Sequence, residues 1–140
     1  MNLELDHKRA LITGSTAGIG YAIAREMIHY GMSKTAQLSI SHGLAMELAG
    51  TGVTVNAVLP GPTRTENTDR MRAERASAAG KTVAEIEADF FVNFRSTSIL
   101  KRFTSAVDVA NLAVYLCGAG ASATTGAALR ADGGVVNQIM

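Results

Sequence analysis

The sequence predicts an α/β fold in which a parallel sheet is flanked by helices, and two observations support this prediction. Short apolar segments of the strand type end in a glycine-rich turn at residues 14–20 and in a Pro-Gly-Pro turn at residues 60–62. Segments with the spacing of helices follow both turns. Strands that alternate with helices are typical of βαβ units, so the strands should lie parallel in one sheet.

The composition is that of one globular domain spanning residues 1–140. The chain is 47% hydrophobic and 18% charged, which is ordinary for a folded protein. Its 13 basic and 12 acidic residues nearly cancel, and this disfavours binding to nucleic acid or to an anionic membrane surface. The start lacks a signal-peptide core, and nowhere do eighteen apolar residues run together. We therefore expect a soluble, cytoplasmic protein.

Cysteine and histidine indicate neither a disulfide nor a metal site. The single cysteine, Cys117, lies in an apolar helical repeat, which predicts a small buried side chain rather than a reactive thiol. His7, His29 and His42 show no metal-ligand spacing with one another or with the carboxylates. We predict that the protein binds no metal.

The first expected strand, Arg9–Thr13, runs directly into the glycine-rich turn, and residues 21–27 then have helical character. This order is that of a phosphate cradle. Gly14 allows a tight turn, Gly18 allows close approach of a pyrophosphate, and Gly20 allows close packing, while the helix start offers free N–H groups. A plain link between strand and helix is the alternative. The candidate cofactor-binding residues here are Gly14, Ser15, Thr16, Gly18, Ile19 and Gly20.

A helix is expected over Ile28–Ala49, and it carries Tyr30 and Lys34 one turn apart. A close ammonium favours the phenolate and lowers the pKa of a tyrosine, so this pair can exchange a proton with an alcohol or a ketone. An ordinary amphipathic tyrosine with a solvated lysine is the alternative. We expect the pair to lie on a different side of the helix from an apolar stripe. That stripe comprises Leu38, Ile40, Leu44, Ala45 and Leu48.

The glycines at residues 50 and 52 should end this helix, and the alternating segment Val53–Leu59 predicts a second strand. Pro60-Gly61-Pro62 then ends the strand. Thr63, Arg64 and Thr65 follow directly, at the position where open α/β sheets bind ligands. An ordinary proline turn is the alternative.

The segment Glu66–Arg95 is charged and helical, and Thr82 with Glu85 has the pattern of a capping box. We interpret the segment as a mobile flap. Its aromatic residues could close over a substrate, although anchoring of the flap to the core is the more ordinary expectation. The aromatic residues are Phe90, Phe91 and Phe94.

Ser105 is positioned to cap a last helix, whose repeat predicts core packing at four apolar positions. These positions are Val107, Ala110, Val114 and Cys117. Ala127–Ala131 is expected to form a third strand, followed by a turn at Asp132-Gly133-Gly134.

Four motifs together resemble the short-chain dehydrogenase/reductase family, and they occur in the order of that family over nearly the whole chain. They are Thr13-Gly14-x-x-x-Gly18-Ile19-Gly20, Tyr30-x-x-x-Lys34, Asn56 before Pro60-Gly61 with Thr65, and Asp132-Gly133-Gly134. The resemblance implies a Rossmann-like parallel sheet and homo-oligomers.

The same resemblance assigns roles to individual residues. The glycine turn would bind the pyrophosphate of NAD or NADP, and Tyr30 would be the general acid/base. Lys34 would hold the nicotinamide ribose and lower the pKa of the tyrosine. Pro60 and Gly61 would belong to the cofactor site, with Thr63 and Thr65 flanking the carboxamide and phosphates. Because the turn offers no positive charge for a 2′-phosphate, the sequence leans slightly towards NAD.

The chain departs from the family pattern between the first two motifs. Only nine residues, Tyr21 to His29, separate the glycine turn from Tyr30, where family members have several strands and helices. The ribose-reading residue and the serine-bearing strand are therefore missing, and the two family pieces join at about Glu26 to Ile28. The fold is thus expected to be truncated or internally deleted. Whether this is a natural deletion or an omitted segment is open.

The leading functional prediction is an NAD(P)-dependent oxidoreductase that interconverts an alcohol and a ketone, with Tyr30 handling the proton. The substrate cannot be read from the sequence. The alternative is a catalytically inactive remnant that binds a nucleotide or acts as an interaction module. The absent serine and ribose reader favour this alternative.

Overall fold

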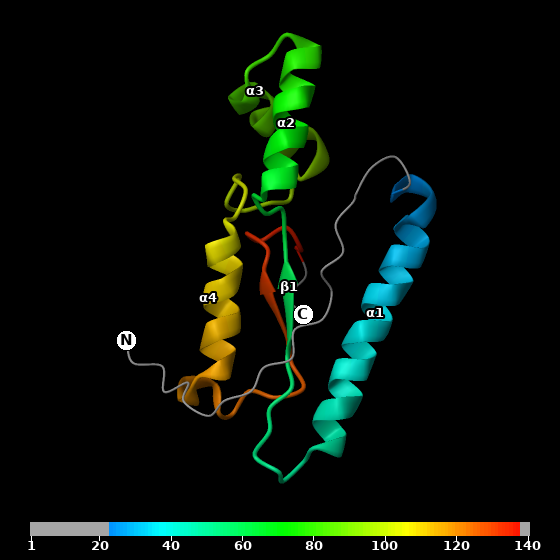
Figure 1. Cartoon of the computed structure of the whole chain (residues 1–140), viewed down its shortest axis with the longest axis vertical. Coiled ribbons are helices and arrows are strands. Elements are labelled where there is room, and N and C mark those ends of the chain that lie inside the picture. The colour runs from blue at the N-terminus through cyan, green and yellow to red at the C-terminus, as the bar shows by residue number, and fades with distance from the viewer. Residues whose placement is uncertain (1–22, 138–140) are drawn as a thin grey trace. The chain divides into compact units, whose positions relative to one another are not determined.

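The computed structural model describes residues 23–137, which fall into two compact units. Residues up to Ala57, together with Val114–Ala128, form unit 1, while Val58–Ala113 and the residues from Leu129 form unit 2. The helices and strands follow in chain order (Figure 1): α1 (Ile23–Glu47), β1 (Ala57–Pro60), α2 (Glu66–Ala79), α3 (Val83–Asp89), the π-helical turn η1 (Phe90–Phe94), α4 (Ala106–Cys117), the 3-10 turn η2 (Ala119–Ala121) and β2 (Ala128–Ala131).

Helix α1 is one continuous helix of 25 residues (Figure 1), where the sequence predicted helical character over residues 21–27 and a helix over Ile28–Ala49. No proline interrupts it, and a single interior glycine such as Gly31 costs only about 1 kcal/mol. The predicted stop is confirmed, because Gly50 and Gly52 both have left-handed backbone, with φ values of 76° and 78°.

The packed face of α1 differs from the predicted one. Ala45 is buried, while Ile40 is 69% exposed and Leu44 is 40% exposed. The less exposed positions recur along one row, which comprises Lys34, Leu38, Ser41, Ala45 and Leu48. Lys34 therefore lies on the packed face rather than on a different one, because its spacing from Leu38 and Ser41 continues that row.

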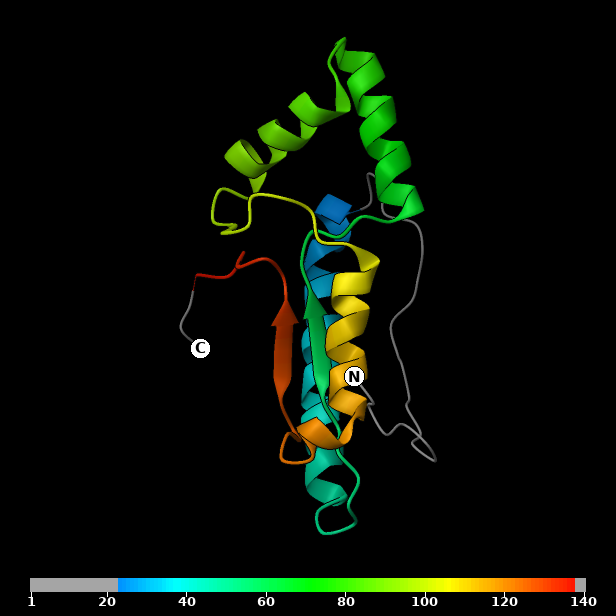
Figure 2. The ribbon, with the colours of Figure 1, turned by 90° about the vertical axis from the view of Figure 1, so that its left-hand side faces the viewer.

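Strands β1 and β2 pair in parallel (Figure 2), as expected for an α/β sheet. Pro60 has no N–H to donate to β2. The pairing of the two segments nevertheless continues at the next residue, because the Gly61 amide donates to the Ala131 carbonyl at 3.2 Å. β1 is shorter at its start than the predicted Val53–Leu59 and ends one residue later. Upstream of it, side-chain bonds from Asn56 replace part of the ladder, with Nδ2 donating to the Thr124 carbonyl at 2.8 Å. The predicted strand Arg9–Thr13 lies outside the described residues.

The two helices of the predicted flap are both capped. At α3, the predicted capping box is confirmed, because Thr82 Oγ1 accepts from the Glu85 amide and the Glu85 side chain accepts from the Thr82 amide. At α2, Thr65 and Thr68 form a box that the sequence prediction missed. Helix α2 ends at Gly80, which has a left-handed φ of 62°.

Helix α4 is capped by Ser105 as predicted, since Ser105 Oγ accepts from the Asp108 amide at 3.0 Å. Its predicted core face is wrong: Val107 is 65% exposed and Val114 is 37% exposed, Ala110 is exposed as well, and Cys117 is only half-buried. The packed residues are instead Val109, Leu112, Ala113 and Leu116. Both faces of this helix are apolar, so the helical repeat alone did not identify the packed one.

Within residues 23–137, none of the helices combines the length and the apolarity that crossing a membrane requires.

Candidate functional site

The predicted site residues fall in three places. The glycine turn lies outside the described residues, and it contains Gly14, Ser15, Thr16, Gly18, Ile19 and Gly20. Tyr30 and Lys34 lie in α1 and belong to unit 1. Pro60, Gly61, Thr63 and Thr65 belong to unit 2.

Tyr30 and Lys34 occupy successive turns of α1, on the row that continues to Leu38. The unbroken backbone from Ile23 fixes this register. The Lys34 side chain is half-buried, and its Nζ donates to Gln37 Oε1 at 3.2 Å. A lysine ammonium has three donors, so it is of the chemical type that can partner a phenolate or a ribose hydroxyl.

The segment Pro60–Thr65 begins where β1 ends, at the carboxyl end of the strand, as the sequence predicted. Gly61 packs directly against the backbone that follows β2. A Cβ atom at Gly61 would lie 2.5 Å from both the Cα and the carbonyl oxygen of Asp132, a distance that real Cβ atoms essentially never show. Only glycine allows this approach.

Thr63 is held by a second chain segment that the sequence did not identify. Its Oγ1 donates to the Gly61 carbonyl at 2.9 Å and lies 3.0 Å from Thr104 Oγ1. The backbone on either side of Thr63 pairs with Thr104 as well, because the Arg64 amide donates to the Thr104 carbonyl at 2.8 Å and the Thr104 amide to the Pro62 carbonyl at 2.9 Å. Thr104 is only 4% exposed, and a lone threonine in a loop gave no local signal of this role.

Thr65 caps α2 and so has a structural role in addition to its predicted one. Its Oγ1 accepts from the Thr68 amide at 3.2 Å, and its own amide donates to Thr68 Oγ1 at 2.8 Å. The N-terminus of α2 is positive because of the helix dipole, which favours a negatively charged or strongly polar group nearby. Glu66 and Asp69 in the first turn already complement part of this charge.

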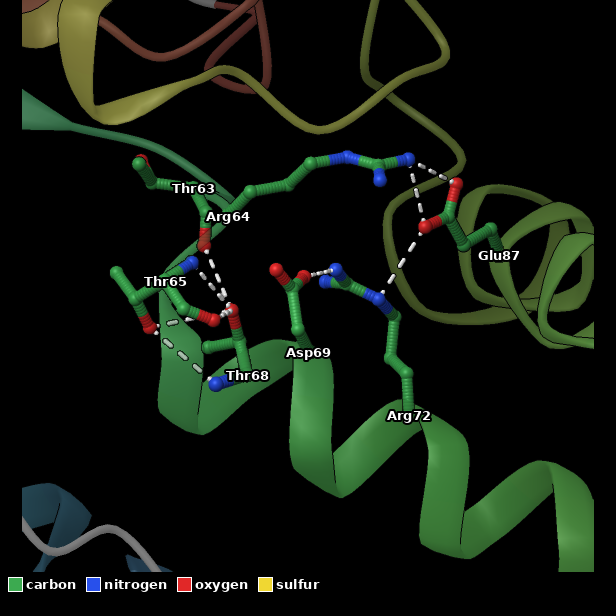
Figure 3. A network of polar contacts seen from close by, with 7 residues as sticks. All are labelled: Thr63, Arg64, Thr65, Thr68, Asp69, Arg72 and Glu87. Atoms are coloured by element: carbon green, nitrogen blue, oxygen red, sulfur yellow. Dashed lines mark hydrogen bonds and ion pairs between the residues drawn. The ribbon is translucent and has the colours of Figure 1, made fainter.

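A network of charged side chains surrounds this segment (Figure 3). Arg64 Nη2 lies 2.8 Å from both carboxylate oxygens of Glu87, which belongs to α3. Arg72 in α2 pairs with Asp69, and its Nε lies 3.2 Å from Glu87 Oε1. The Arg72 side chain is only 8% exposed, and its guanidinium carbon lies 4.4 Å from the centre of the Phe103 ring. Four charges thus meet at the base of the flap and balance one another.

The aromatic residues of the flap pack against one another and against Phe103. The Phe90 and Phe91 rings each lie 5.0 Å from the Phe103 ring, and Phe91 is only 4% exposed. This arrangement corresponds to the ordinary expectation that they anchor the flap. Phe94, in contrast, is 59% exposed. A hollow of about 490 Å³ adjoins the cluster, and it is lined by Ala88, Phe91, Val92, Ser96 and Lys101.

The predicted turn after β2 is confirmed, and it connects two segments of unit 2 that are distant in the sequence. The Gly133 carbonyl accepts from the amides of Ile99 and Leu100, both at 3.0 Å. Asp132 Oδ1 accepts from the Gly134 amide at 2.9 Å, while Asp132 Oδ2 is buried and has no hydrogen-bond partner among residues 23–137. A Cβ atom at Gly134 would meet Ile99 at 2.7 Å. The turn therefore packs against residues 99–100.

Among residues 23–137, no group of three or more His, Cys, Asp or Glu side chains could hold a metal ion. In this part of the chain, Tyr30 and Lys34 occupy one row of helix α1. Separately, the hydroxyl groups of Thr65 and Thr68 lie at the positively polarised N-terminus of α2. These groups suit proton transfer and the binding of a polar, anionic molecule.

Comparison with known proteins gives consistent matches. A protein-family model described as enoyl-(acyl carrier protein) reductase matches residues 5–136. The chain is 41% identical over 137 residues to the uncharacterized oxidoreductase YvaG of Bacillus subtilis, a match that covers 98% of this chain and 51% of YvaG. It is 42% identical over 113 residues to the uncharacterized oxidoreductase YvrD of the same organism, covering 81% of this chain and 43% of YvrD.

Solved structures agree with the sequence matches. L-sorbose reductase from Gluconobacter frateurii, complexed with NADPH and L-sorbose, superposes with a TM-score of 0.70 at 26% identity, covering 79% of this chain and 41% of that one. This similarity confirms the predicted α/β, Rossmann-like fold class. The chain spans about half the length, or less, of the relatives that it matches.

Proposed function

Since the chain belongs to the short-chain dehydrogenase/reductase family, we propose that it acts as a nicotinamide-dependent oxidoreductase that interconverts an alcohol and a ketone. The observation that carries this proposal is the register of Tyr30 and Lys34 on the continuous helix α1. A phenol and an ammonium one turn apart can serve the same small molecule. The inactive remnant is not favoured, because the two relatives that match at 41% and 42% identity are described as oxidoreductases.

Tyr30 is the proposed general acid/base. In the reduction of a ketone it donates its phenolic proton to the carbonyl oxygen, and in the oxidation of an alcohol it takes the hydroxyl proton back. The Lys34 ammonium stabilises the phenolate that remains after donation. A nicotinamide cofactor, when bound, supplies or accepts the hydride.

The cofactor would be held in part by Pro60–Thr65. The fit is chemical: threonine hydroxyls and the positive N-terminus of α2 suit an amide or phosphate group. The close contact of Gly61 with Asp132 keeps this segment at the carboxyl end of β1. Since the superposed L-sorbose reductase is complexed with NADPH, we propose NADP(H), in place of the slight lean towards NAD drawn from the sequence.

Replacement of Tyr30 by phenylalanine tests the chemistry. Tyr30→Phe should abolish turnover of a small ketone such as L-sorbose and leave the dissociation constant of NADPH nearly unchanged, because only the transferable proton is removed. Tyr115→Phe is the matched control, since the bond recorded for the Tyr115 hydroxyl among residues 23–137 is a donation to the Gly120 carbonyl at 3.4 Å. Turnover that survives in Tyr30→Phe overturns the assignment.

Replacement of Lys34 tests the second residue. Lys34→Ala should lower turnover and also weaken NADPH binding, because the ammonium is proposed to contact both the phenol and the cofactor ribose. Lys34→Arg, which keeps the charge, should retain part of both. Unchanged affinity for NADPH in Lys34→Ala would overturn the proposed contact of Lys34 with the cofactor ribose.

The cofactor preference is measured by titrating NADPH and NADH separately and following nicotinamide fluorescence at one ionic strength. We expect tighter binding of NADPH. Tenfold tighter binding of NADH, about 1.4 kcal/mol, would restore the preference for NAD.

A further inference from the structure

Arg64 connects the proposed cofactor segment to the flap. Its backbone lies between Thr63 and Thr65, and its amide is tied to the Thr104 carbonyl at 2.8 Å. Its side chain extends the other way and donates from Nη2 to both oxygens of Glu87 at 2.8 Å (Figure 3). The segment is therefore held on one side by backbone pairing and on the other by a single charged pair.

Glu87 is also bound from a second direction, by Arg72 at 3.2 Å. This arginine is a fixed partner, because its side chain is only 8% exposed and its guanidinium group is packed over the Phe103 ring. Glu87 itself is 19% exposed at its side chain, while Arg64 is 50% exposed. The carboxylate is thus fixed by the buried arginine and presents its oxygens to the exposed one.

The geometry assigns Glu87 as a positioning residue for the segment Pro60–Thr65, acting through Arg64. Glu87 joins three parts of the chain: the proposed cofactor segment, α2 and α3. Thr65 is tied to the same assembly because it caps α2. A change at Glu87 therefore alters the orientation of Thr63 and Thr65 without removing any group that contacts the cofactor. This inference rests on the proposed function, since it assumes that these threonines bind NADPH.

The test compares Glu87→Gln, Arg64→Gln and the double variant by titrating NADPH against the full chain, with nicotinamide fluorescence as the readout. Each single variant should weaken binding about fivefold to tenfold, because coupling through a network typically has this size. The double variant should be no weaker than the worse single one, since both changes break the same link. Arg64→Lys should recover part of the affinity, because a lysine can still pair with Glu87 at one point.

Lys81→Gln is the matched control. Lys81 pairs with Asp89 at 2.6 Å in the same flap, and neither residue touches the segment Pro60–Thr65 or Glu87 in the described contacts. This variant should leave the affinity for NADPH unchanged even where it lowers the melting temperature. A merely structural role of Glu87 would make it behave in the same way.

Each outcome has a separate meaning. Wild-type affinity for NADPH in both Glu87→Gln and Arg64→Gln overturns the inference alone. Tighter binding in Glu87→Gln also overturns it, because the released arginine would then act as a direct phosphate ligand. If far-UV circular dichroism shows that Glu87→Gln is unfolded, Arg64→Gln decides, since it leaves the buried pair of Arg72 and Glu87 in place. A wild-type chain that binds neither NADPH nor NADH overturns the proposed function, and this inference with it.

Discussion

Helix α1 and the loops around Pro60–Thr65 carry the two halves of the proposed chemistry, and they are stabilised in different ways. Among the described side chains of α1 only Ala45 is buried, and the helix is tied to a distant segment where His42 Nδ1 lies 3.0 Å from the Gly126 carbonyl oxygen. The loops of unit 2 instead pack backbone against backbone, as at Gly61 and Asp132. Local helical hydrogen bonds therefore set the register of Tyr30 and Lys34, while tertiary contacts set the cofactor segment.

This difference implies that the same substitution should have opposite effects in the two regions. A glycine on an exposed helix only lowers helical stability, whereas a glycine at a close backbone approach is required by packing. Glycine to alanine is therefore the most informative single change in this chain.

Gly61→Ala should have the largest effect. The new Cβ would meet backbone atoms of Asp132 at 2.5 Å, and backbone cannot move aside as a flexible side chain can. We expect a loss of about 3 kcal/mol in the free energy of unfolding, at the upper end for overpacking. Urea unfolding followed by far-UV circular dichroism measures it. A loss below about 0.5 kcal/mol, the size of an ordinary surface change, would show that the two segments separate easily.

Thr82→Ala should cost about 1 kcal/mol, because it removes the side-chain acceptor of the α3 capping box. Thr82→Ser keeps the hydroxyl and serves as the control. The same unfolding assay applies, and equal stability of the two variants would mean that α3 is held by tertiary contacts alone. In that case α3, like the loops around Gly61, would be stabilised by tertiary contacts rather than by local hydrogen bonds.

The sequence predicted those features that a few neighbouring residues determine. The capping box at Thr82, the cap at Ser105 and the glycine stop after α1 each depend on residues at most three positions apart. The box at Thr65 was missed because its partner is Thr68, where the common pattern has Glu or Gln. Local chemistry was thus read correctly where it followed the common pattern.

The network around Glu87 could not be predicted, since Arg64, Arg72, Glu87 and Phe103 are far apart in the sequence. Taken singly in the sequence, each of these residues looks like an ordinary surface charge or core aromatic residue. Only the fold brings them together. The predicted position of Pro60–Thr65 at the carboxyl end of β1 is confirmed, because the strand and the turn that ends it are both local features, while the role of this segment in binding a cofactor stays a prediction. What holds the segment there depends on tertiary contacts and carries no local signal.

Gly43→Ala should be stabilising, in contrast to Gly61→Ala. Gly43 lies in α1, and no atom of the described part of the chain lies within 4 Å of where a Cβ would be, so alanine should add about 0.5–1 kcal/mol through its higher helix propensity. Gly50→Ala is the control, because its surroundings are equally open but its φ of 76° is left-handed. Thermal unfolding should order the three proteins as Gly43→Ala, wild type and Gly50→Ala. Destabilisation by Gly43→Ala would mean that a partner packs on that face of α1.

Acid should produce the smallest effect, and it should arise from the flap rather than from the loops around Gly61. The hydrogen bond from the Thr82 amide, and then that from its hydroxyl, hold the pKa of Glu85 below its ordinary value of 4.5. A carboxylate with a lowered pKa contributes stability that is complete above the ordinary value and is lost as the pH falls through the folded-state value. Glu85→Gln keeps an acceptor but does not titrate. The difference in melting temperature between wild type and Glu85→Gln should therefore be present at pH 7 and shrink as the pH falls below the ordinary value of 4.5. A difference that stays constant throughout the acid range in which the chain remains folded would show that the charge of this carboxylate does not strengthen the cap.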